Sequence, residues 1–274
     1  MQKKIVVLLI IGFIVVGGNL FAQQHADCDR LFLRAVQNDD NNEVMVHLNH
    51  SWGNLNVRDT RGRTGLMIAI ENGNRQMVEM ILNANKSVIN TDAEDQNGLT
   101  ALMYAINKGN LVILNILLDE RQGINVNFQT VGQRNTALHY AVERRRDDMV
   151  ARLLEHKSMQ TTLADMNGET AFMIAVRTGQ RNVVRLFART PAFDVTARPY
   201  GIAEGIPPLL MAIRNNYSPE IIEDILLITG AINSEDERGN GIYEYLEASR
   251  YSARNKQRIR DMVAAAERRD LRNF

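Results

Sequence analysis

Four short stretches of this chain repeat nearly the same residues at almost constant spacing. They are Thr64-Gly-Leu-Met-Ile-Ala69, Thr100-Ala-Leu-Met-Tyr-Ala105, Thr136-Ala-Leu-His-Tyr-Ala141 and Thr170-Ala-Phe-Met-Ile-Ala175. Their threonines stand 36, 36 and 34 residues apart. A small structural unit that recurs at such a period is typical of a stacked repeat array, in which each unit contacts its neighbours and no single large core is needed.

Each position of the repeated stretch has a structural reason to recur. Threonine is a good N-cap because its hydroxyl accepts a hydrogen bond from a free N–H at the start of a helix. The leucine and alanine that follow at helical spacing face inward, and the small alanine lets neighbouring helices approach closely. A later glycine, Gly73 in the first full unit, supplies the positive φ angle that ends the helix. The sequence therefore predicts an all-α chain of antiparallel helix pairs.

The longer template around these stretches resembles the ankyrin repeat, whose period is about 33 residues and whose signature is Thr-Pro-Leu-His-x-Ala. In the first full unit the template runs Asp59, Gly62, Thr64, Leu66, Ala69, Gly73, Met77-Val78 and Ile81-Leu82. The resemblance implies an all-α ankyrin-repeat solenoid of helix-turn-helix units, with hairpin loops that project sideways. It also implies a scaffold that binds other proteins and carries out no catalysis.

On this template the chain divides into eight consecutive segments. We expect a signal peptide or N-terminal anchor (1–22), an N-terminal capping repeat (23–58), ankyrin repeats 1 (59–94), 2 (95–130), 3 (131–164), 4 with a long loop (165–201) and 5 (202–235), and a degenerate C-terminal capping repeat (236–274).

Several positions depart from the template. The third unit has Arg134 and Arg145 where glycine is expected, and a non-glycine residue held at positive φ is strained. Asn38 and Asn216 stand at the corresponding turns of the flanking units. His139 is at the position where the family's histidine bonds neighbouring hairpins, so the resemblance implies a structural role for it.

The N-terminus has the layout of a secretory signal peptide. Lys3 and Lys4 precede the apolar run 5–16, and small residues lead to an expected cleavage site after Ala22. The alternative is an uncleaved membrane anchor. Either reading predicts export, to the periplasm or cell envelope of a bacterium or into the medium otherwise. One cysteine, Cys28, rules out an intrachain disulfide.

Composition and motifs favour binding over chemistry. The 32 basic and 32 acidic residues leave no net field to attract nucleic acid. The pairs His25/Cys28 and His47/His50 offer too few ligands for a closed zinc site, and the sequence has no phosphate loop or nucleophile elbow. We therefore predict no enzyme activity, cofactor or metal. An enzyme, or a metal or small-molecule binder with a site built from scattered loops, stays the alternative.

The resemblance locates a partner-binding surface on the hairpin tips and on the exposed edges of the first helices, which line a concave groove in the family. Transferred to this chain, the surface comprises Thr60, Arg61, Arg63, Glu71, Asn72, Gln96, Asn97, Leu99, Asn107, Lys108, Gln133, Asn135, Glu143, Arg144, Met166, Asn167, Glu169, Arg177 and Thr178, with Arg214-Asn215 in the fifth unit. Leu99 and Met166 are expected to be exposed apolar anchors. The loop 191–208 adds Tyr200, which either contacts the partner or packs with Phe193 beneath the loop.

Two runs of basic residues leave two interpretations open. Arg144-Arg145-Arg146 lies at a turn between helices, and the segment 250–274 contains eight basic and three acidic residues. The first run could contact an acidic partner and the second an anionic surface, or the side chains of either run could simply be solvated.

Overall fold

The computed structural model describes residues 18–49, 54–84, 89–190, 193, 206–228 and 231–270 of the 274-residue chain. The chain forms two compact units, residues 1–89 and 90–274, which we describe separately. In the described residues the regular structure is helical, with two isolated β-bridges at hairpin bases, Arg58 to Thr64 and Ala164 to Thr170. The all-α fold predicted from the repeats is confirmed.

Unit 1 contains two helix pairs. The helices are α2 (Gly18–Gln37), α3 (Asn41–Asn49), α4 (Gly65–Asn72) and α5 (Arg75–Ala84). The first helix of each pair packs on the other first helix, α2 on α4, and the second helices α3 and α5 pack in the same way. The helix α2 begins inside the expected signal segment 1–22.

Close packing explains why the first repeated stretch carries glycine after its threonine. A Cβ atom built on Gly65 would lie 2.6 Å from Cε1 of Phe32, a fully buried side chain of α2. The equivalent positions in unit 2 hold alanine, Ala101, Ala137 and Ala171. Gly65 thus makes room for the phenylalanine of the preceding helix.

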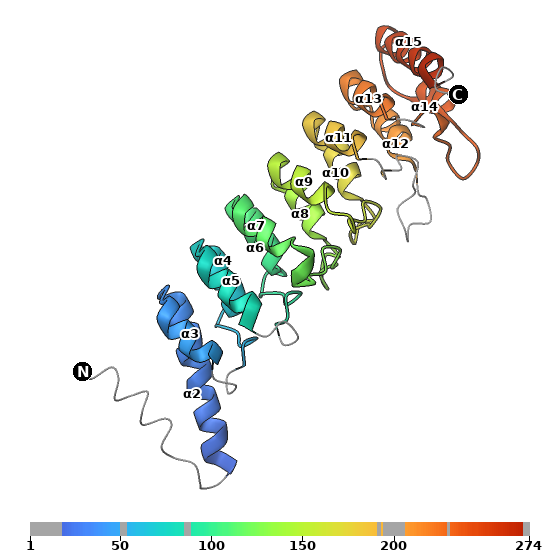
Figure 1. Ribbon diagram of the computed structural model, residues 1–274. Helices are drawn as coiled ribbons and strands as arrows, with labels where there is room; N and C mark the ends of the chain where they lie inside the picture. The colour runs from blue at the N-terminus through green and yellow to red at the C-terminus, as the bar shows by residue number, and fades with distance from the viewer. Residues whose placement is uncertain are drawn as a thin grey trace. The chain divides into compact units, whose positions relative to one another are not determined.

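Unit 2 continues the helix-pair pattern (Figure 1). Its elements are α6 (Ala101–Lys108), α7 (Leu111–Leu117), η1 (Glu120–Gln122), α8 (Ala137–Glu143), α9 (Asp147–Leu154), α10 (Ala171–Arg177), α11 (Arg181–Ala188), α12 (Pro208–Arg214), α13 (Pro219–Leu226), η2 (Ala231–Asn233), α14 (Ile242–Ala248) and α15 (Ala253–Asp270). The first helices stack in the order α6, α8, α10, α12 and α14, and the second helices stack as α7, α9, α11, α13 and α15.

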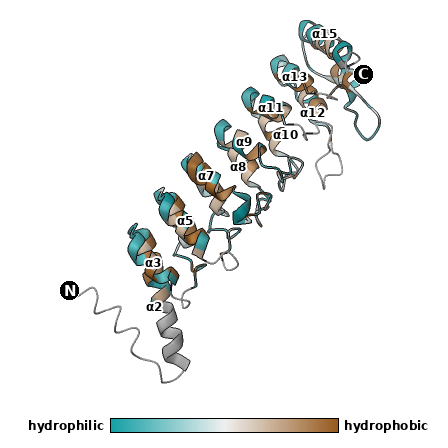
Figure 2. Cartoon of the chain, viewed as in Figure 1, coloured by the Kyte–Doolittle hydropathy of each residue, from teal (hydrophilic) through white to brown (hydrophobic). Residues whose placement is uncertain are grey.

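The core of unit 2 lies between these two layers. The template alanines Ala105, Ala141 and Ala175 are completely buried, as is expected where first helices approach one another, and Leu102 is buried beside them. The outer turns of the second helices are mostly hydrophilic (Figure 2), with α7 an exception because Val112 keeps 52% of its surface exposed.

The inter-helix turns keep the left-handed conformation even where glycine is missing. Gly109 and Gly179 have φ angles of 67° and 70°, and Arg145 and Asn216 adopt 54° and 57° at the same place. In unit 1 the prediction was wrong by one residue, because Asp39 rather than Asn38 has the positive φ, at 59°. Aspartate and asparagine tolerate this conformation better than other non-glycine residues.

Side chains at these turns join consecutive repeats. Arg146 donates to the carbonyl of Asn107 at the end of α6, and Arg145 donates to the carbonyl of Thr178 just after α10, both at 3.1 Å. Gln180 donates to the carbonyl of Val142 in α8 at 3.0 Å. These bonds satisfy carbonyls that a helix end leaves free. Two arginines of the basic run 144–146 are therefore inter-repeat ties, not merely solvated side chains.

The basic residues of α15 are largely used within the chain. Arg258 pairs with Glu220 on α13, Arg260 pairs with Glu247, and Lys256 and Arg269 donate to backbone carbonyls. The C-terminal basic segment thus anchors the last helix to the array. Within the described ranges, no helix is both long enough and apolar enough to span a bilayer.

Candidate functional site

Four hairpins are built in the same way around an aspartate. In each hairpin, Oδ1 of the aspartate accepts hydrogen bonds from the backbone N–H groups two and four residues later, at 2.8–2.9 Å. The four aspartates are Asp59 in unit 1 and Asp95, Asp165 and Asp236 in unit 2. Hydrogen bonds to its carboxylate lower the pKa of Asp236 to about 2, and the bond from the Asn240 side chain has the largest effect. This bonding fixes the shape of each hairpin tip.

The second carboxylate oxygen ties two of these hairpins to their helices. The Tyr104 hydroxyl donates to Oδ2 of Asp95 at 2.9 Å, and the Tyr245 hydroxyl donates to Oδ2 of Asp236 at 3.1 Å. Tyr140 occupies the same place on α8, but its buried hydroxyl has no hydrogen-bond partner in the described parts of the chain. The difference arises from the hairpin that precedes α8.

That third hairpin has no aspartate and is one residue longer. Thr130 takes the aspartate's role, since its hydroxyl accepts from the N–H of Asn135 at 3.1 Å and its own N–H donates to the Asn135 carbonyl at 3.0 Å. Arg134 keeps the left-handed conformation at φ 55°. The extra residue pushes Val131 outward, where 86% of its surface is exposed.

Hydrogen bonds join the third hairpin to its neighbours. The backbone N–H of Val131 donates to the Glu94 carboxylate of the second hairpin at 2.8 Å. The N–H of Met166 on the fourth hairpin donates to the Gln133 carbonyl at 2.9 Å. Two exposed apolar residues, Val131 and Met166, with 55% of Met166 exposed, thus lie on adjoining, directly bonded hairpins.

His139 links its repeat to the next one. Its Nδ1 lies 2.8 Å from the Thr136 hydroxyl, and its Nε2 lies 3.1 Å from the carbonyl oxygen of Glu169 on the fourth hairpin. Burial lowers the pKa of this imidazole, although the Glu169 carbonyl opposes the shift. A buried, neutral histidine with both nitrogens engaged is a structural group, in agreement with the role that the resemblance implied.

The exposed ends of the first helices carry mixed charge. Asn107, Lys108, Glu143 and Arg144 are exposed, and the Arg144 guanidinium lies 4.9 Å from the centre of the Tyr140 ring. Burial raises the pKa of Glu143, and the negative charge of the nearby Asp165 raises it further.

Other expected contact residues are partly engaged inside the chain. Arg177 forms a two-pronged ion pair with Glu169 at 2.8 Å. Asn135 is half-buried, and so is Thr178, whose hydroxyl donates to the Ile174 carbonyl at 2.7 Å. Gln96, Asn97, Gln133 and Asn167 have exposed side chains at the hairpin tips.

Two of the expected partner-binding residues are placed differently from the prediction. Leu99 is half-buried and is not an exposed anchor. Arg63 in unit 1 is largely buried because its guanidinium pairs with Asp59 and Glu71. The Arg63 side chain thus stabilises its own repeat, whereas Thr60, Arg61 and Asn72 remain exposed.

The long fourth connection is described in part. The Phe193 ring packs at a tilt against the rings of Phe172 and Phe187, with ring centres 4.7 and 5.1 Å apart, so this residue packs beneath the loop. Tyr200 lies outside the described residues. Sequence reasoning missed Val131, which the extra residue before Thr136 could have indicated.

Metal ligands do not gather in the residues that the structure describes: no group of three or more histidine, cysteine, aspartate or glutamate side chains is close enough to hold an ion. Cys28 is half-buried and not disulfide-bonded, and His47 lies edge-on to Phe32. The side chain of His25, and His50, fall outside the described parts.

Comparison with known proteins identifies the class. The family described as ankyrin repeats (3 copies) matches residues 32–130 and 122–199, more than half of the chain, and the chain belongs to this family. Ankyrin repeats are in general protein–protein interaction modules.

Individual relatives are distant or much longer. Neurogenic locus notch homolog protein 1 of Xenopus tropicalis and that of Xenopus laevis are each 30% identical over 127 residues, 46% of this chain, and the match spans 5% of their length. Among solved structures, the ankyrin repeat domain of Bcl-3, a member of the IkappaB family, superposes with a TM-score of 0.67 at 19% identity, covering 85% of this chain and 97% of that one. This structural likeness supports the fold alone.

Proposed function

We propose that this protein is a non-catalytic adaptor that binds another protein through the hairpin tips and first-helix edges of unit 2. The observation that carries the proposal is the exposure of Val131 and Met166 on adjoining, hydrogen-bonded hairpins. We call the exposed tip residues of these hairpins the hairpin-tip row: Gln96, Asn97, Val131, Gln133, Met166 and Asn167.

The hairpin-tip row has the composition of an interface. The apolar Val131 and Met166 have the polar Gln133 and Asn167 beside them. Protein interfaces usually combine an apolar centre with a polar, solvent-accessible rim in this way. The bonds from Val131 to Glu94 and from Met166 to Gln133 hold the tips in place before a partner arrives. Preorganised groups lose little conformational entropy on binding, which favours affinity.

The test is affinity capture with the full chain from its own cells. We expect a partner that the wild type retains and the double variant Val131→Ser, Met166→Ser loses. The matched control is Val112→Ser on α7, since Val112 is also an exposed valine but lies in the second-helix layer. A partner that Val112→Ser removes equally, or one that the double variant keeps, contradicts the proposed surface.

We also propose that the protein acts outside the cytoplasm. The support is the order of Lys3-Lys4, the apolar run 5–16 and Ala22 in the sequence. Cell fractionation followed by N-terminal sequencing tests the proposal. A mature chain that begins at Gln23 in the exported fraction is expected, and an intact N-terminus in the cytoplasmic fraction contradicts export.

A further inference from the structure

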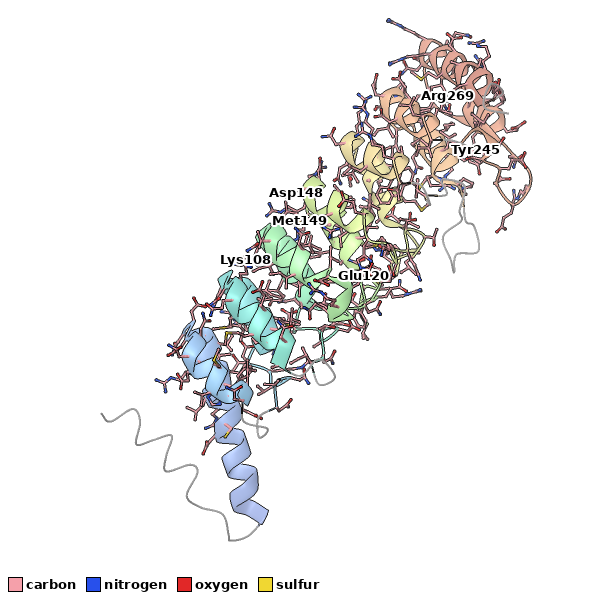
Figure 3. All side chains as sticks on the ribbon, in the orientation of Figure 1. Lys108, Glu120, Asp148, Met149, Tyr245 and Arg269 are labelled. Atoms are coloured by element: carbon pink, nitrogen blue, oxygen red, sulfur yellow. The ribbon has the colours of Figure 1, made fainter. Side chains whose placement is uncertain are left out.

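Every first helix of unit 2 ends at or within two residues of an exposed basic side chain. We call these five residues the helix-end row: Lys108 on α6, Arg144 after α8, Arg177 on α10, Arg214 on α12 and Arg250 after α14. Because the first helices stack in that order, the five basic residues follow one another along one edge of unit 2. Lys108 marks the start of the row in Figure 3.

Most of the row's charge is available to a partner. Arg177 pairs with Glu169, but Lys108, Arg144 and Arg214 form no ion pair with a carboxylate in the described parts of the chain. This separates them from Arg145 and Arg146, which bond to helix-end carbonyls. Basic residues at helix C-termini also stabilise the helix dipole, so the test below needs a readout beyond stability.

The spacing of the basic residues in the helix-end row favours one extended conformation of an acidic partner over another. Packed helices lie about 8–10 Å apart, so the basic residues recur at about that distance. A polyproline II segment rises about 3.1 Å per residue with three residues per turn, which places every third side chain on one face at about 9 Å intervals. A β-strand instead presents alternate residues, about 7 Å apart on one face.

We propose that the partner contributes an extended polyproline II segment with an acidic side chain at every third position, which lies along the helix-end row. The inference rests on the proposed protein-binding function and names the chemistry of its partner. Carboxylates suit the arginine fork of Arg144 and Arg214. A nucleic-acid duplex is a poorer match, because its phosphates repeat about every 3.4 Å along each strand, whereas the basic residues of the row recur about every 8–10 Å.

Glu143 supplies an internal control. It lies beside Arg144 with an exposed side chain, and its negative charge repels an acidic segment. Replacement Glu143→Gln should therefore strengthen binding, whereas loss of a basic residue should weaken it.

The probe is a fluorescent peptide of repeating Pro-Pro-Glu triplets, one triplet for each basic residue of the row, and binding to the full chain is followed by fluorescence anisotropy. Proline-rich repeats favour the polyproline II conformation. One control peptide carries glutamine for glutamate, and another has the same composition with its glutamates clustered at one end. Polythymidine of equal charge tests the nucleic-acid alternative.

We expect binding of the triplet peptide that weakens about two- to fivefold for each of Lys108→Gln, Arg144→Gln and Arg214→Gln. Glu143→Gln should bind more tightly, and added salt should weaken binding. The matched control Arg268→Gln removes an exposed charge from α15, away from the row, and should leave affinity unchanged. Thermal unfolding of each variant checks that the fold persists.

Equal binding of the clustered peptide, equal loss in Arg268→Gln, or tighter binding of polythymidine would overturn the inference. If the triplet peptide fails to bind while capture of a partner still depends on Val131 and Met166, the inference fails and the proposed function stands. If the peptide binds and no partner depends on Val131 and Met166, the hairpin-tip surface fails instead.

Discussion

The hydroxyl of Tyr104 donates a 2.9 Å hydrogen bond to the buried carboxylate of Asp95 and so ties the first helix of a repeat to its own hairpin. Tyr245 and Asp236 form the same bond at 3.1 Å. In the third repeat Tyr140 keeps the tyrosine and lacks the acceptor, because Thr130 and Val131 replace the aspartate. Three repeats thus share one tyrosine position, with the hydrogen bond made in two of them.

This difference gives a matched pair of substitutions. Tyr104→Phe leaves Oδ2 of the buried Asp95 carboxylate with only the longer bond from the Asn97 side chain, at 3.4 Å, and should lower the free energy of unfolding by about 1–3 kcal/mol. Tyr140→Phe removes a hydroxyl that has no hydrogen-bond partner among the described residues and keeps the ring under the Arg144 guanidinium, so it should be neutral or slightly stabilising. Urea unfolding of both variants measures the difference, and equal losses would contradict the assigned hydrogen bonds.

The two arginines at positive φ should respond differently to glycine. Arg134 has an exposed side chain and φ 55°, so Arg134→Gly relieves backbone strain and should stabilise the protein by about 0.5–1 kcal/mol. Arg145→Gly relieves the same strain at φ 54° but loses the bond to the Thr178 carbonyl. We therefore expect Arg145→Gly to stabilise the protein less than Arg134→Gly does, or to destabilise it. Thermal unfolding of the two variants side by side tests this order, and a larger gain for Arg145→Gly contradicts it.

Burial predicts that substitutions at Leu102 and Asn107 differ in their effect on stability. Leu102 is buried between the helix layers, so Leu102→Ala should lower the free energy of unfolding by about 2–5 kcal/mol. Asn107→Ala, at an exposed helix end, should change it by about 0.5 kcal/mol or less. Chemical denaturation of both variants checks the helical register. Similar small effects at both positions would show that the register is wrong.

His139 makes stability depend on pH. Burial lowers its pKa in the folded state below the unfolded value of about 6.5. The unfolded chain therefore binds the proton first, so the contribution of His139 is complete above about pH 6.5 and is lost as the pH falls below that value. The difference in unfolding free energy between wild type and His139→Gln should shrink as the pH falls from neutral. A pH-independent difference would mean that the imidazole titrates normally.

The repeated template predicted the helices well because its positions report buried packing. Thr64, Thr136 and Thr170 accept from the backbone N–H three residues later, as N-caps should, and the template alanines are buried. The fold needed no more than these local rules, since each repeat packs on copies of itself.

The surface was harder to predict because it depends on details that the template does not contain. One extra residue in the third hairpin exposes Val131, and the ion pairs of Arg63 with Asp59 and Glu71 remove an expected contact residue. The roles of Arg145 and Arg146 depend on carbonyls in neighbouring repeats. Those carbonyls lie more than thirty positions from the arginines that bond to them, and the spacing of the repeats does not reveal such contacts.

The most direct test of the protein-binding surface is photo-crosslinking in the protein's own cells, with benzoylphenylalanine placed at residue 131 or, in a separate strain, at residue 112. Both native residues are exposed valines of unit 2, one on a hairpin tip and one on the second-helix layer. We predict a discrete crosslinked protein from position 131 that is absent from position 112. Crosslinks of equal yield at both positions, or a partner found at position 112 alone, would contradict the account.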